Sequence, residues 1–380
     1  MLFLYIIFGI AIALGILSLV DGAKSIRHIR TYRPRSTWRP RVVVFCPCRG
    51  VDHGLRENIL SILEQSYAPM RAVFILDSAS DPAFNVLTGL NATVLIAGEA
   101  TERGQKVHNL IYGVEHAAAD AEVFVFCDAD ARFPPDWVAT LIAPLESDEV
   151  AVATGYRWYT AENGTLPGLM RSAWNASVVT ALGNHDNNFA WGGSTALRRS
   201  TFDALQIRKA WNGALSDDYA VTRAARKSGK PIVFVPECLI PTYGDCTWGE
   251  LLEFTTRQIV ITRVYDPSTW GKLFVAQTIF NVAFWSAVFL SGSFLLVPLT
   301  LYLLAGIKSY LRYEAVATVL PPAALSKHRA SYILLAPLTA LLFEINLVRS
   351  VLTRSITWRQ IRYRLVSPDR TVVQRGAGES

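Results

Sequence analysis

The segment Val123-Phe-Val-Phe-Cys-Asp-Ala-Asp-Ala-Arg-Phe133 places five residues of strong β character directly before two carboxylates, Asp128 and Asp130. A short apolar run of this kind predicts a strand buried in a parallel sheet. Ligands of open α/β sheets bind beyond the carboxyl ends of the strands, where this strand would deliver both acids. Two neighbouring carboxylates repel each other unless a cation lies between them, and oxygen ligands suit Mg²⁺ or Mn²⁺, which commonly bridge to phosphate. The segment therefore predicts a metal–diphosphate site, with an acidic turn that caps the following helix as the alternative.

Strand-like and helix-like segments alternate through roughly the first 150 residues of the chain. Strands are expected at 41–46, 72–76, 93–96, 123–127 and 150–155, and helices at 52–65, from Asp81-Pro82 onward, 105–118 and 135–145. This alternation predicts an α/β fold with a mostly parallel sheet covered by helices. No GxGxxG follows the first strand and no GxxxxGK[ST] occurs. A nucleotide would therefore be held by neither a dinucleotide-binding fingerprint nor a P-loop.

Charge and hydrophobicity are unevenly distributed along the chain. Residues 2–20 carry no charge and are long enough for a membrane helix, with a cleaved signal peptide as the competing interpretation. Residues 22–51 contain eight Lys or Arg and no acid, residues 349–375 contain seven Arg and one acid, and residues 42–272 contain 19 basic and 26 acidic residues. Because the positive charge flanks apolar runs and the centre is acidic, the positive-inside rule explains the high pI better than nucleic-acid binding does.

A second apolar region follows the acidic centre. Residues 273–306 are uncharged, which predicts either one broken helix or a hairpin of two, and residues 332–347 form another apolar run of marginal length for a full span. The chain is therefore expected to be an integral membrane protein. Its predicted regions are a membrane anchor (1–22), a basic cytosolic stem (23–40), a nucleotide-binding half (41–155), an acceptor-binding and catalytic half (156–270), membrane or interfacial helices (271–350) and a basic cytosolic tail (351–380). The five cysteines, an odd number, are expected to be reduced thiols facing the cytosol.

Four further residues are candidates for the chemistry of the site. Asp218 begins a helical stretch, and a carboxylate there is suited to take a proton from an attacking hydroxyl, although an acid pair at a helix start also stabilises the helix. Lys106 starts a helix at the ligand end of the sheet, where an ammonium would meet a diphosphate or simply be solvated. Arg257 and Arg263 precede the apolar region, and their guanidinium groups suit either a diphosphate or anionic lipid headgroups.

The order of several motifs resembles the ceramide glucosyltransferases and their bacterial membrane relatives, a branch of the inverting family-two glycosyltransferases, over nearly the whole chain. The matching segments are Cys48-Arg-Gly-Val-Asp52, Asp81-Pro82-Ala83, Lys106-Val-His-Asn-Leu110, Asp128, Gly192-Gly193-Ser194, Asp217-Asp218-Tyr219 and Trp358-Arg359 with Arg362-Tyr-Arg-Leu365. One departure concerns the family's (Gln/Arg)-x-x-Arg-Trp motif. Here Arg257 is kept, but Val260-Ile261 replace the Arg-Trp pair, which disfavours a polymerase.

The resemblance implies a Rossmann-like GT-A nucleotide-sugar domain flanked by N- and C-terminal membrane helices. It implies transfer of a hexose, with glucose as the first candidate, from a UDP-sugar to a lipid hydroxyl, ceramide-like or other, at the cytosolic membrane face. The membrane would be the inner membrane of a bacterium, or the Golgi or ER membrane of a eukaryote. By the same resemblance Asp81 contacts the nucleotide, Asp128 and Asp130 hold Mn²⁺ or Mg²⁺, and Asp218 is the base. Lys106 and Arg257, with Arg263 as a substitute, would contact the diphosphate.

Three alternatives to a single-sugar transferase remain open. A processive polysaccharide synthase would make chains of sugar, and a non-catalytic membrane protein would bind nucleotide-sugars without transfer. A transporter is disfavoured by the long acidic centre of the chain. No nucleic-acid partner is expected, and the sequence identifies no protein partner.

Overall fold

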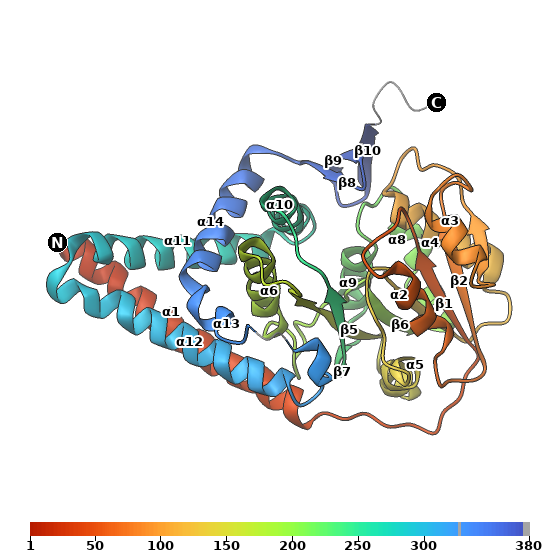
Figure 1. The fold of residues 1–380 in the computed structure, drawn as a ribbon, viewed down its shortest axis with the longest axis horizontal. Coiled ribbons are helices and arrows are strands. Elements are labelled where there is room, and N and C mark those ends of the chain that lie inside the picture. Colours follow the sequence, from red (N-terminus) through yellow and green to blue (C-terminus); the bar gives the residue numbers. More distant parts are fainter. Residues whose placement is uncertain (326–327, 375–380) are drawn as a thin grey trace. The chain divides into compact units, whose positions relative to one another are not determined.

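The computed structural model describes residues 1–325 and 328–374, and the chain divides into two compact units. The sheet unit comprises Tyr32–Trp158, Asn184–Tyr243 and Ser355–Ser380. The helical unit comprises Met1–Thr31, Tyr159–Gly183 and Gly244–Arg354. Each unit is therefore assembled from three separate stretches of the chain (Figure 1).

A seven-stranded sheet organises the sheet unit, with the strand order β3-β2-β1-β4-β6-β5-β7. The strands are β1 (Val42–Pro47), β2 (Met70–Leu76), β3 (Thr93–Ile96), β4 (Val123–Cys127), β5 (Val152–Thr160), β6 (Ser194–Arg198) and β7 (Ile232–Tyr243). The first four strands pair in parallel, whereas β6 pairs antiparallel with both β4 and β5. The mostly parallel α/β sheet predicted from the alternating pattern is confirmed.

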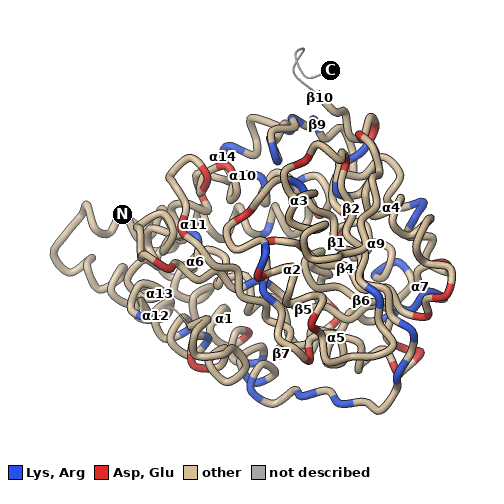
Figure 2. Tube along the Cα trace, turned by 45° about the vertical axis from the view of Figure 1, so that its right-hand side comes forward, with Lys and Arg blue, Asp and Glu red and all other residues tan. Residues whose placement is uncertain are grey.

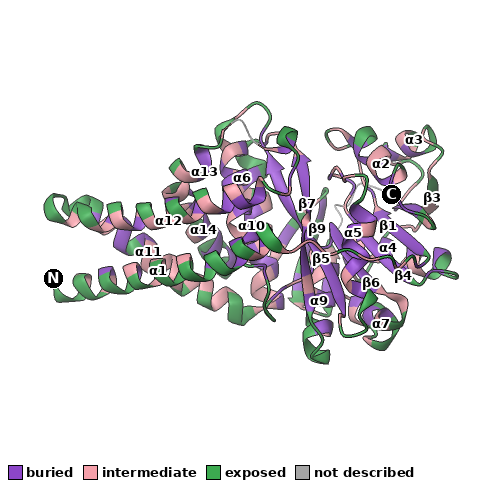
Figure 3. Cartoon of the chain, turned by 90° about the horizontal axis from the view of Figure 1, so that it is seen from below, coloured by how far each residue is buried: buried purple, intermediate pink, exposed green. Residues whose placement is uncertain are grey.

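Helices cover the sheet because their apolar faces need a partner surface. They are α2 (Leu55–Leu63), α3 (Ala83–Thr88), α4 (Gln105–Ala117), α5 (Trp137–Ile142) with η1 (Ala143–Glu146), α7 (Arg199–Ala204), α8 (Ile207–Trp211) and α9 (Asp217–Ser228). Two apolar clusters result, in which alternate residues of β1 and β4 point to opposite sides: Val44 and Val125 join one cluster, and Phe45 and Phe126 the other. Both clusters are buried, as the purple strands in Figure 3 show.

The described residues from Ser355 onward form a small sheet. Residues predicted as part of a basic tail form a three-stranded antiparallel sheet of β8 (Ser355–Trp358), β9 (Ile361–Ser367) and β10 (Arg370–Gln374). Burial alternates along β9, with Tyr363 and Leu365 inside and Arg362 and Arg364 outside. This small sheet belongs to the sheet unit, where the Tyr363 hydroxyl accepts a hydrogen bond from the backbone N–H of Gln105 at 3.3 Å.

The part of the predicted basic stem that follows Thr31 belongs to the sheet unit. Arginine residues recur along the extended segment between the first helix and β1 (Figure 2). The Arg35 guanidinium donates to both carboxylate oxygens of Glu237, at 2.6 and 2.9 Å, and the Ser36 hydroxyl donates to Glu146 at 2.7 Å. Part of the positive charge here is therefore paired within the protein.

The helical unit contains the apolar segments of the chain. Its elements are α1 (Leu2–Thr31), α6 (Leu166–Val179), α10 (Trp248–Tyr265), α11 (Pro267–Leu290), η2 (Gly292–Leu295), α12 (Leu296–Val316), η3 (Pro322–Ala324), α13 (Ser331–Leu334) and α14 (Ala336–Leu352). One apolar cluster joins α1, α11 and α12 through residues such as Phe8, Phe284 and Leu301, and another joins α6, α10 and α14 through Trp174, Ile259 and Phe343. The helices α1, α11 and α12 lie side by side in Figure 1 and leave much of their surface exposed in Figure 3.

Three helices in the described part of the chain are long and apolar enough to cross a membrane: Leu2–Thr31, Pro267–Leu290 and Gly292–Val316. The uncharged region 273–306 is thus a hairpin of two helices, because the chain reverses at Ser291 and Gly292, which both have positive φ. The 17-residue helix α14 is shorter than these three. Helix α1 continues to Thr31, so Lys24, Arg27 and Arg30 extend the helix beyond the predicted boundary at residue 22.

Candidate functional site

Four segments of the sheet unit meet beyond the end of β4. They are the turn after β4, the first turn of α4, the loop that enters β6, and the first turn of α9. The register of β6 on β4 sets Ser194 opposite Cys127, so the preceding glycines reach the turn that carries Asp128. The backbone N–H of Gly104 donates to the carbonyl of Ala214 at 2.9 Å, which holds the start of α4 against the segment leading into α9.

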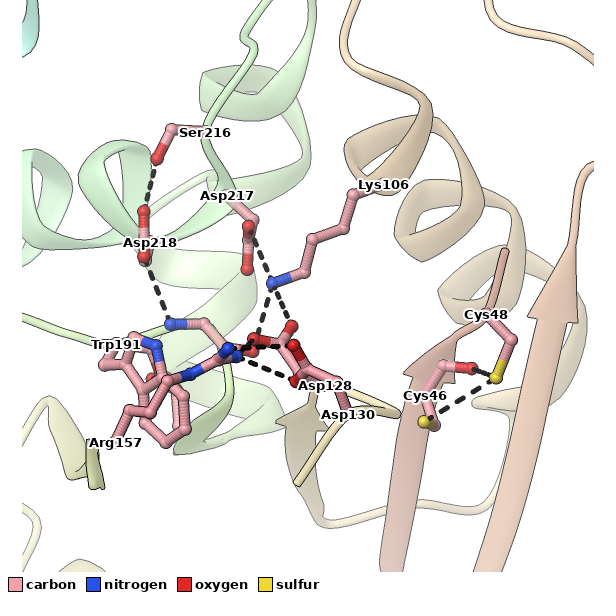
Figure 4. A network of polar contacts seen from close by, with 12 residues as sticks. Cys46, Cys48, Lys106, Asp128, Asp130, Arg157, Trp191, Ser216, Asp217 and Asp218 are labelled. Atoms are coloured by element: carbon pink, nitrogen blue, oxygen red, sulfur yellow. Dashed lines mark hydrogen bonds and ion pairs between the residues drawn. The ribbon is translucent and has the colours of Figure 1, made fainter. Parts of the chain in front are cut away.

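Lys106 lies at the centre of this arrangement (Figure 4). Its ammonium is 2.7 Å from Asp128 Oδ1 and 3.2 Å from Asp217 Oδ1, and it donates to the carbonyl of Gly192 at 3.2 Å. Burial alone would lower the pKa of Lys106, but the carboxylates of Asp128, Asp217 and Asp218 outweigh burial and raise that pKa. Lys106 is therefore a permanently charged group that ties α4 to the acids of β4 and α9.

Asp217 and Asp218 differ in surroundings although they are adjacent. Asp217 is buried, and burial raises the pKa of its carboxyl to about 6; Lys106 opposes the rise, and Asp218 and Asp128 add to it. Asp218 is half-buried and accepts hydrogen bonds from the backbone N–H of Gly192 at 3.2 Å, from that of Tyr219 at 2.7 Å, and from the Ser216 hydroxyl. Asp218 is thus the more accessible of the two carboxylates and is held in one orientation.

Arg157 forms ion pairs with both Asp128 and Asp130. Its Nη2 lies 2.8 Å from Asp128 Oδ2 and 2.8 Å from Asp130 Oδ1, and its Nη1 lies 2.8 Å from Asp130 Oδ2. The guanidinium carbon lies 5.1 Å from the centre of the Trp191 ring. Burial would raise the pKa of the Asp128 carboxyl, but Lys106 and Arg157 outweigh burial and lower it. Sequence reasoning did not identify Arg157, because the predicted strand ended at residue 155 and the observed strand continues past it.

Further polar contacts hold the loops after β1 and β2: hydrogen bonds to one aspartate and two ion pairs. Asp81 accepts the backbone N–H of Gly50 on both carboxylate oxygens at 3.0 Å and that of Ala83 at 2.8 Å, so it joins the loop after β1 to the start of α3. Arg49 forms an ion pair with Asp77. The chain reaches this region again through the turn between β8 and β9, where Arg359 forms an ion pair with Asp52.

The predicted residues therefore fall into two groups. Lys106, Asp128, Asp130 and Asp218 come together in the sheet unit, and Asp81 lies in the same unit. Arg257 and Arg263 lie on α10 in the helical unit. The Arg263 guanidinium donates to the carbonyl of Val351 at 3.1 Å and to that of Ser350, where it meets the C-terminal end of α14. Their predicted contact with the diphosphate stays a prediction, as does the use of each residue in the first group.

The donor set fits a divalent ion that is only partly coordinated by protein. Asp128 and Asp130 offer hard oxygen ligands, but within residues 1–325 and 328–374 no three His, Cys, Asp or Glu side chains gather to hold a metal. Mg²⁺ and similar ions are commonly held by one or two carboxylates together with the phosphates of a substrate. The two aspartates therefore suit an ion that arrives with a nucleotide diphosphate, provided that Arg157 gives up its contacts.

Gly192 lies where no side chain fits. A Cβ at this position would collide with Asp217 Oδ2 and lie 2.7 Å from Lys106 Nζ. We expect Gly192→Ala to displace this ion pair and to lower the free energy of unfolding by about 1–3 kcal/mol, a typical cost of overpacking. Thermal unfolding of the full chain would measure the change. Gly249→Ala is the control, because a Cβ there meets only Thr247 Oγ1 at 3.9 Å; equal unfolding temperatures for both variants would contradict the prediction.

Two solved structures that match this chain are enzymes that act on sugar compounds. The mannosyltransferase PcManGT from Pyrobaculum calidifontis, solved in complex with GDP-Man and Mn²⁺, matches with a TM-score of 0.51 and 17% identity over 92% of this chain and 98% of its own. Glucosyl-3-phosphoglycerate synthase from Mycobacterium tuberculosis, solved with phosphoglyceric acid, matches with a TM-score of 0.39 and 15% identity over 60% of this chain and 84% of its own. The first match supports the GT-A-like α/β fold, and the second is too distant to add to it.

The model of one protein family, glycosyl transferase family 21, matches residues 2–371 of the chain. The match includes the sheet unit with its charged site, the three candidate membrane helices and the small C-terminal sheet up to Thr371. The chain belongs to glycosyl transferase family 21 and is a glycosyltransferase.

Proposed function

We propose that the protein is an inverting hexosyltransferase that moves a sugar, with glucose from UDP-glucose as the first candidate, to the hydroxyl of a membrane lipid. The observation that carries the proposal is the meeting of Asp128, Asp130, Lys106 and Asp218 beyond the end of one buried strand. These side chains combine hard oxygen ligands, a cation for a diphosphate and a separate carboxylate. Transfer from a nucleotide-sugar with inversion needs this combination.

Each residue has a role set by its surroundings. Asp218, held by three donors and half-buried, accepts the proton of the acceptor hydroxyl as its oxygen attacks the anomeric carbon. Lys106 offers its ammonium to the diphosphate, and Asp217 keeps that ammonium in place. Asp81, at the loop after β2, contacts the nucleoside. A divalent ion, Mn²⁺ or Mg²⁺, held by Asp128 and Asp130 would neutralise negative charge on the leaving diphosphate.

The lipid acceptor is supported by the helical unit. It contains the three candidate membrane helices and a cavity of about 810 Å³ whose walls come from α6, α12, α13 and the segment before α13. Leucine side chains such as Leu169 and Leu334 line this cavity, and Arg329 and Tyr310 also contribute to its wall. A largely apolar pocket with a few polar groups suits an amphipathic lipid.

The test is product analysis with the full chain reconstituted in lipid nanodiscs. We expect that incubation with Mn²⁺, a lipid extract and one nucleotide-sugar at a time will yield a lipid heavier by one hexose, detected by mass spectrometry. UDP-glucose, UDP-galactose and GDP-mannose form the donor series, since the mannosyltransferase of similar fold was solved with GDP-Man. Sugar chains instead of single additions would indicate a polysaccharide synthase, and nucleotide binding without any transfer would contradict the proposal.

A further inference from the structure

The four carboxylate oxygens of Asp128 and Asp130 all lie against cationic donors of the protein itself. Asp128 Oδ1 faces Lys106, whereas Asp128 Oδ2 and both oxygens of Asp130 face Arg157, each at 2.7 to 2.8 Å. Figure 4 shows the Arg157 guanidinium directed at both acids. Any other cation that binds these oxygens must therefore compete with contacts that already exist.

Arg157 is well suited to hold this position. The side chain comes from β5, whose nine residues are all buried, so its backbone is fixed and only 8% of the residue is exposed. A planar guanidinium matches carboxylate oxygens in a fork that a lysine does not reproduce. The guanidinium carbon lies 5.1 Å from the centre of the Trp191 ring. The backbone N–H of Trp191 donates to Thr154 Oγ1 at 2.9 Å, which fixes the backbone that carries this ring. The ring offers the guanidinium a second favourable contact within the same site.

A nucleotide diphosphate would change this balance, because its oxygens compete with the carboxylates for the same guanidinium. Once Arg157 turns to the diphosphate, the oxygens of Asp128 and Asp130 become available to a divalent ion. The protein holds no third acidic, Cys or His ligand there within its described residues, so the diphosphate also supplies oxygens that the ion lacks.

We propose that Arg157 is a tethered counter-ion that keeps the carboxylates of Asp128 and Asp130 closed to metal until a nucleotide diphosphate draws it away. This inference rests on the proposed function, since it concerns the same site. It makes Arg157 a positioning residue that couples metal binding to nucleotide binding. By linkage, the nucleotide strengthens metal affinity by the same factor as the metal strengthens nucleotide affinity.

Binding of Mn²⁺ alone tests the proposal without any sugar transfer. The full chain in nanodiscs is titrated with Mn²⁺, and the free ion is followed by electron paramagnetic resonance with and without UDP. For the natural sequence we expect UDP to strengthen Mn²⁺ binding by about 10-fold or more, within the usual range of coupling between sites. For Arg157→Met we expect Mn²⁺ binding without UDP to strengthen by about 10-fold, and the effect of UDP to shrink by a similar factor.

The matched control is Arg198→Met. Arg198 also pairs with an aspartate, Asp148, at 2.9 Å and stacks over a tryptophan, Trp38, at 4.6 Å. Arg198 lies opposite Val123, at the start of β4, whereas the site lies beyond Cys127 at the end of that strand. We expect this variant to bind Mn²⁺ as the natural sequence does. Arg157→Lys, which keeps the charge without the fork, should fall between Arg157→Met and the natural sequence.

Two results would overturn the inference. One is Mn²⁺ binding to the natural protein that is equally tight with and without UDP, a measurement that depends on no variant. The other is a folded Arg157→Met protein whose Mn²⁺ affinity without UDP is unchanged or weaker, which would make Arg157 a structural support for the two acids. Absence of lipid product with the UDP effect intact would instead count against the proposed acceptor, so the two failures are distinguishable.

Discussion

Replacement of Asp218 by Asn is expected to lower the rate of sugar transfer by about 10²–10⁴-fold, the contribution of a positioned general base. The amide keeps nearly the same shape but accepts no proton at neutral pH. Nucleotide-sugar binding should remain, because Lys106, Asp128 and Asp130 are untouched. The backbone N–H of Tyr219 donates to Oδ1 and that of Gly192 to Oδ2, so the single amide oxygen of Asn can accept only one of these two hydrogen bonds. Initial rates of lipid glycosylation and calorimetric titration with UDP measure the two effects separately.

The control for this variant is Asp186→Asn, which removes an exposed carboxylate from the same unit. It should transfer sugar at the rate of the natural sequence. If Asp218→Asn also transferred at that rate, Asp218 would not be the base. The neighbouring Asp217 would then be the remaining candidate for the base on α9, although it is buried and its carboxylate lies 3.2 Å from the Lys106 ammonium.

Replacement of Asp128 by Asn is expected to weaken Mn²⁺-dependent binding of the nucleotide by about 10-fold or more. The variant loses the coupling between metal and nucleotide, and each 1.36 kcal/mol of lost coupling corresponds to about tenfold. The substitution also leaves Lys106 and Arg157 with one carboxylate partner fewer. Titration with UDP in the presence of Mn²⁺, and again with the metal removed by a chelator, measures the loss.

The chelator arm supplies the control for Asp128→Asn. Without metal the natural sequence should bind UDP weakly, and the variant should bind it with similar or greater affinity, because Lys106 and Arg157 are then freer to contact phosphate. Thermal unfolding shows whether the variant is folded. An Asp128→Asn protein that is folded and binds UDP with full Mn²⁺ dependence would remove Asp128 from the metal site.

Many elements of the sheet unit follow from local sequence pattern. The apolar runs at 93–96 and 123–127 are β3 and β4 with the predicted bounds, and the predicted helix at 105–118 is α4, one residue shorter. These predictions succeed because a buried strand or an amphipathic helix needs apolar residues at fixed spacing, whatever the rest of the chain does. The local pattern does not decide whether the apolar region 273–306 is one broken helix or a hairpin, since this depends on the backbone conformation at Ser291 and Gly292.

The C-terminal residues show where pattern reasoning fails. A stretch rich in arginine resembles a solvated tail, yet β9 alternates buried and exposed residues and places Tyr363 and Leu365 inside. Tyr363 then contacts Gln105, 258 positions away in the sequence, and Arg359 contacts Asp52, 307 positions away. Neither partner is visible from the local pattern, because pairing between distant strands and loops depends on how the chain returns to the sheet.

The sequence alone determined which acids end a buried strand and which segments are apolar enough for a membrane, because these properties depend on neighbouring residues. It also determined which family the chain resembles, because that depends on the order of motifs along the chain. Only the tertiary structure decided which charges neutralise each other. Arg157 is 27 positions from Asp130, and Asp217 is 111 positions from Lys106, yet each pair is in contact. Ion pairs form over a few ångströms of space, and the folding of β5 and α9 onto the end of β4 brings those side chains within reach.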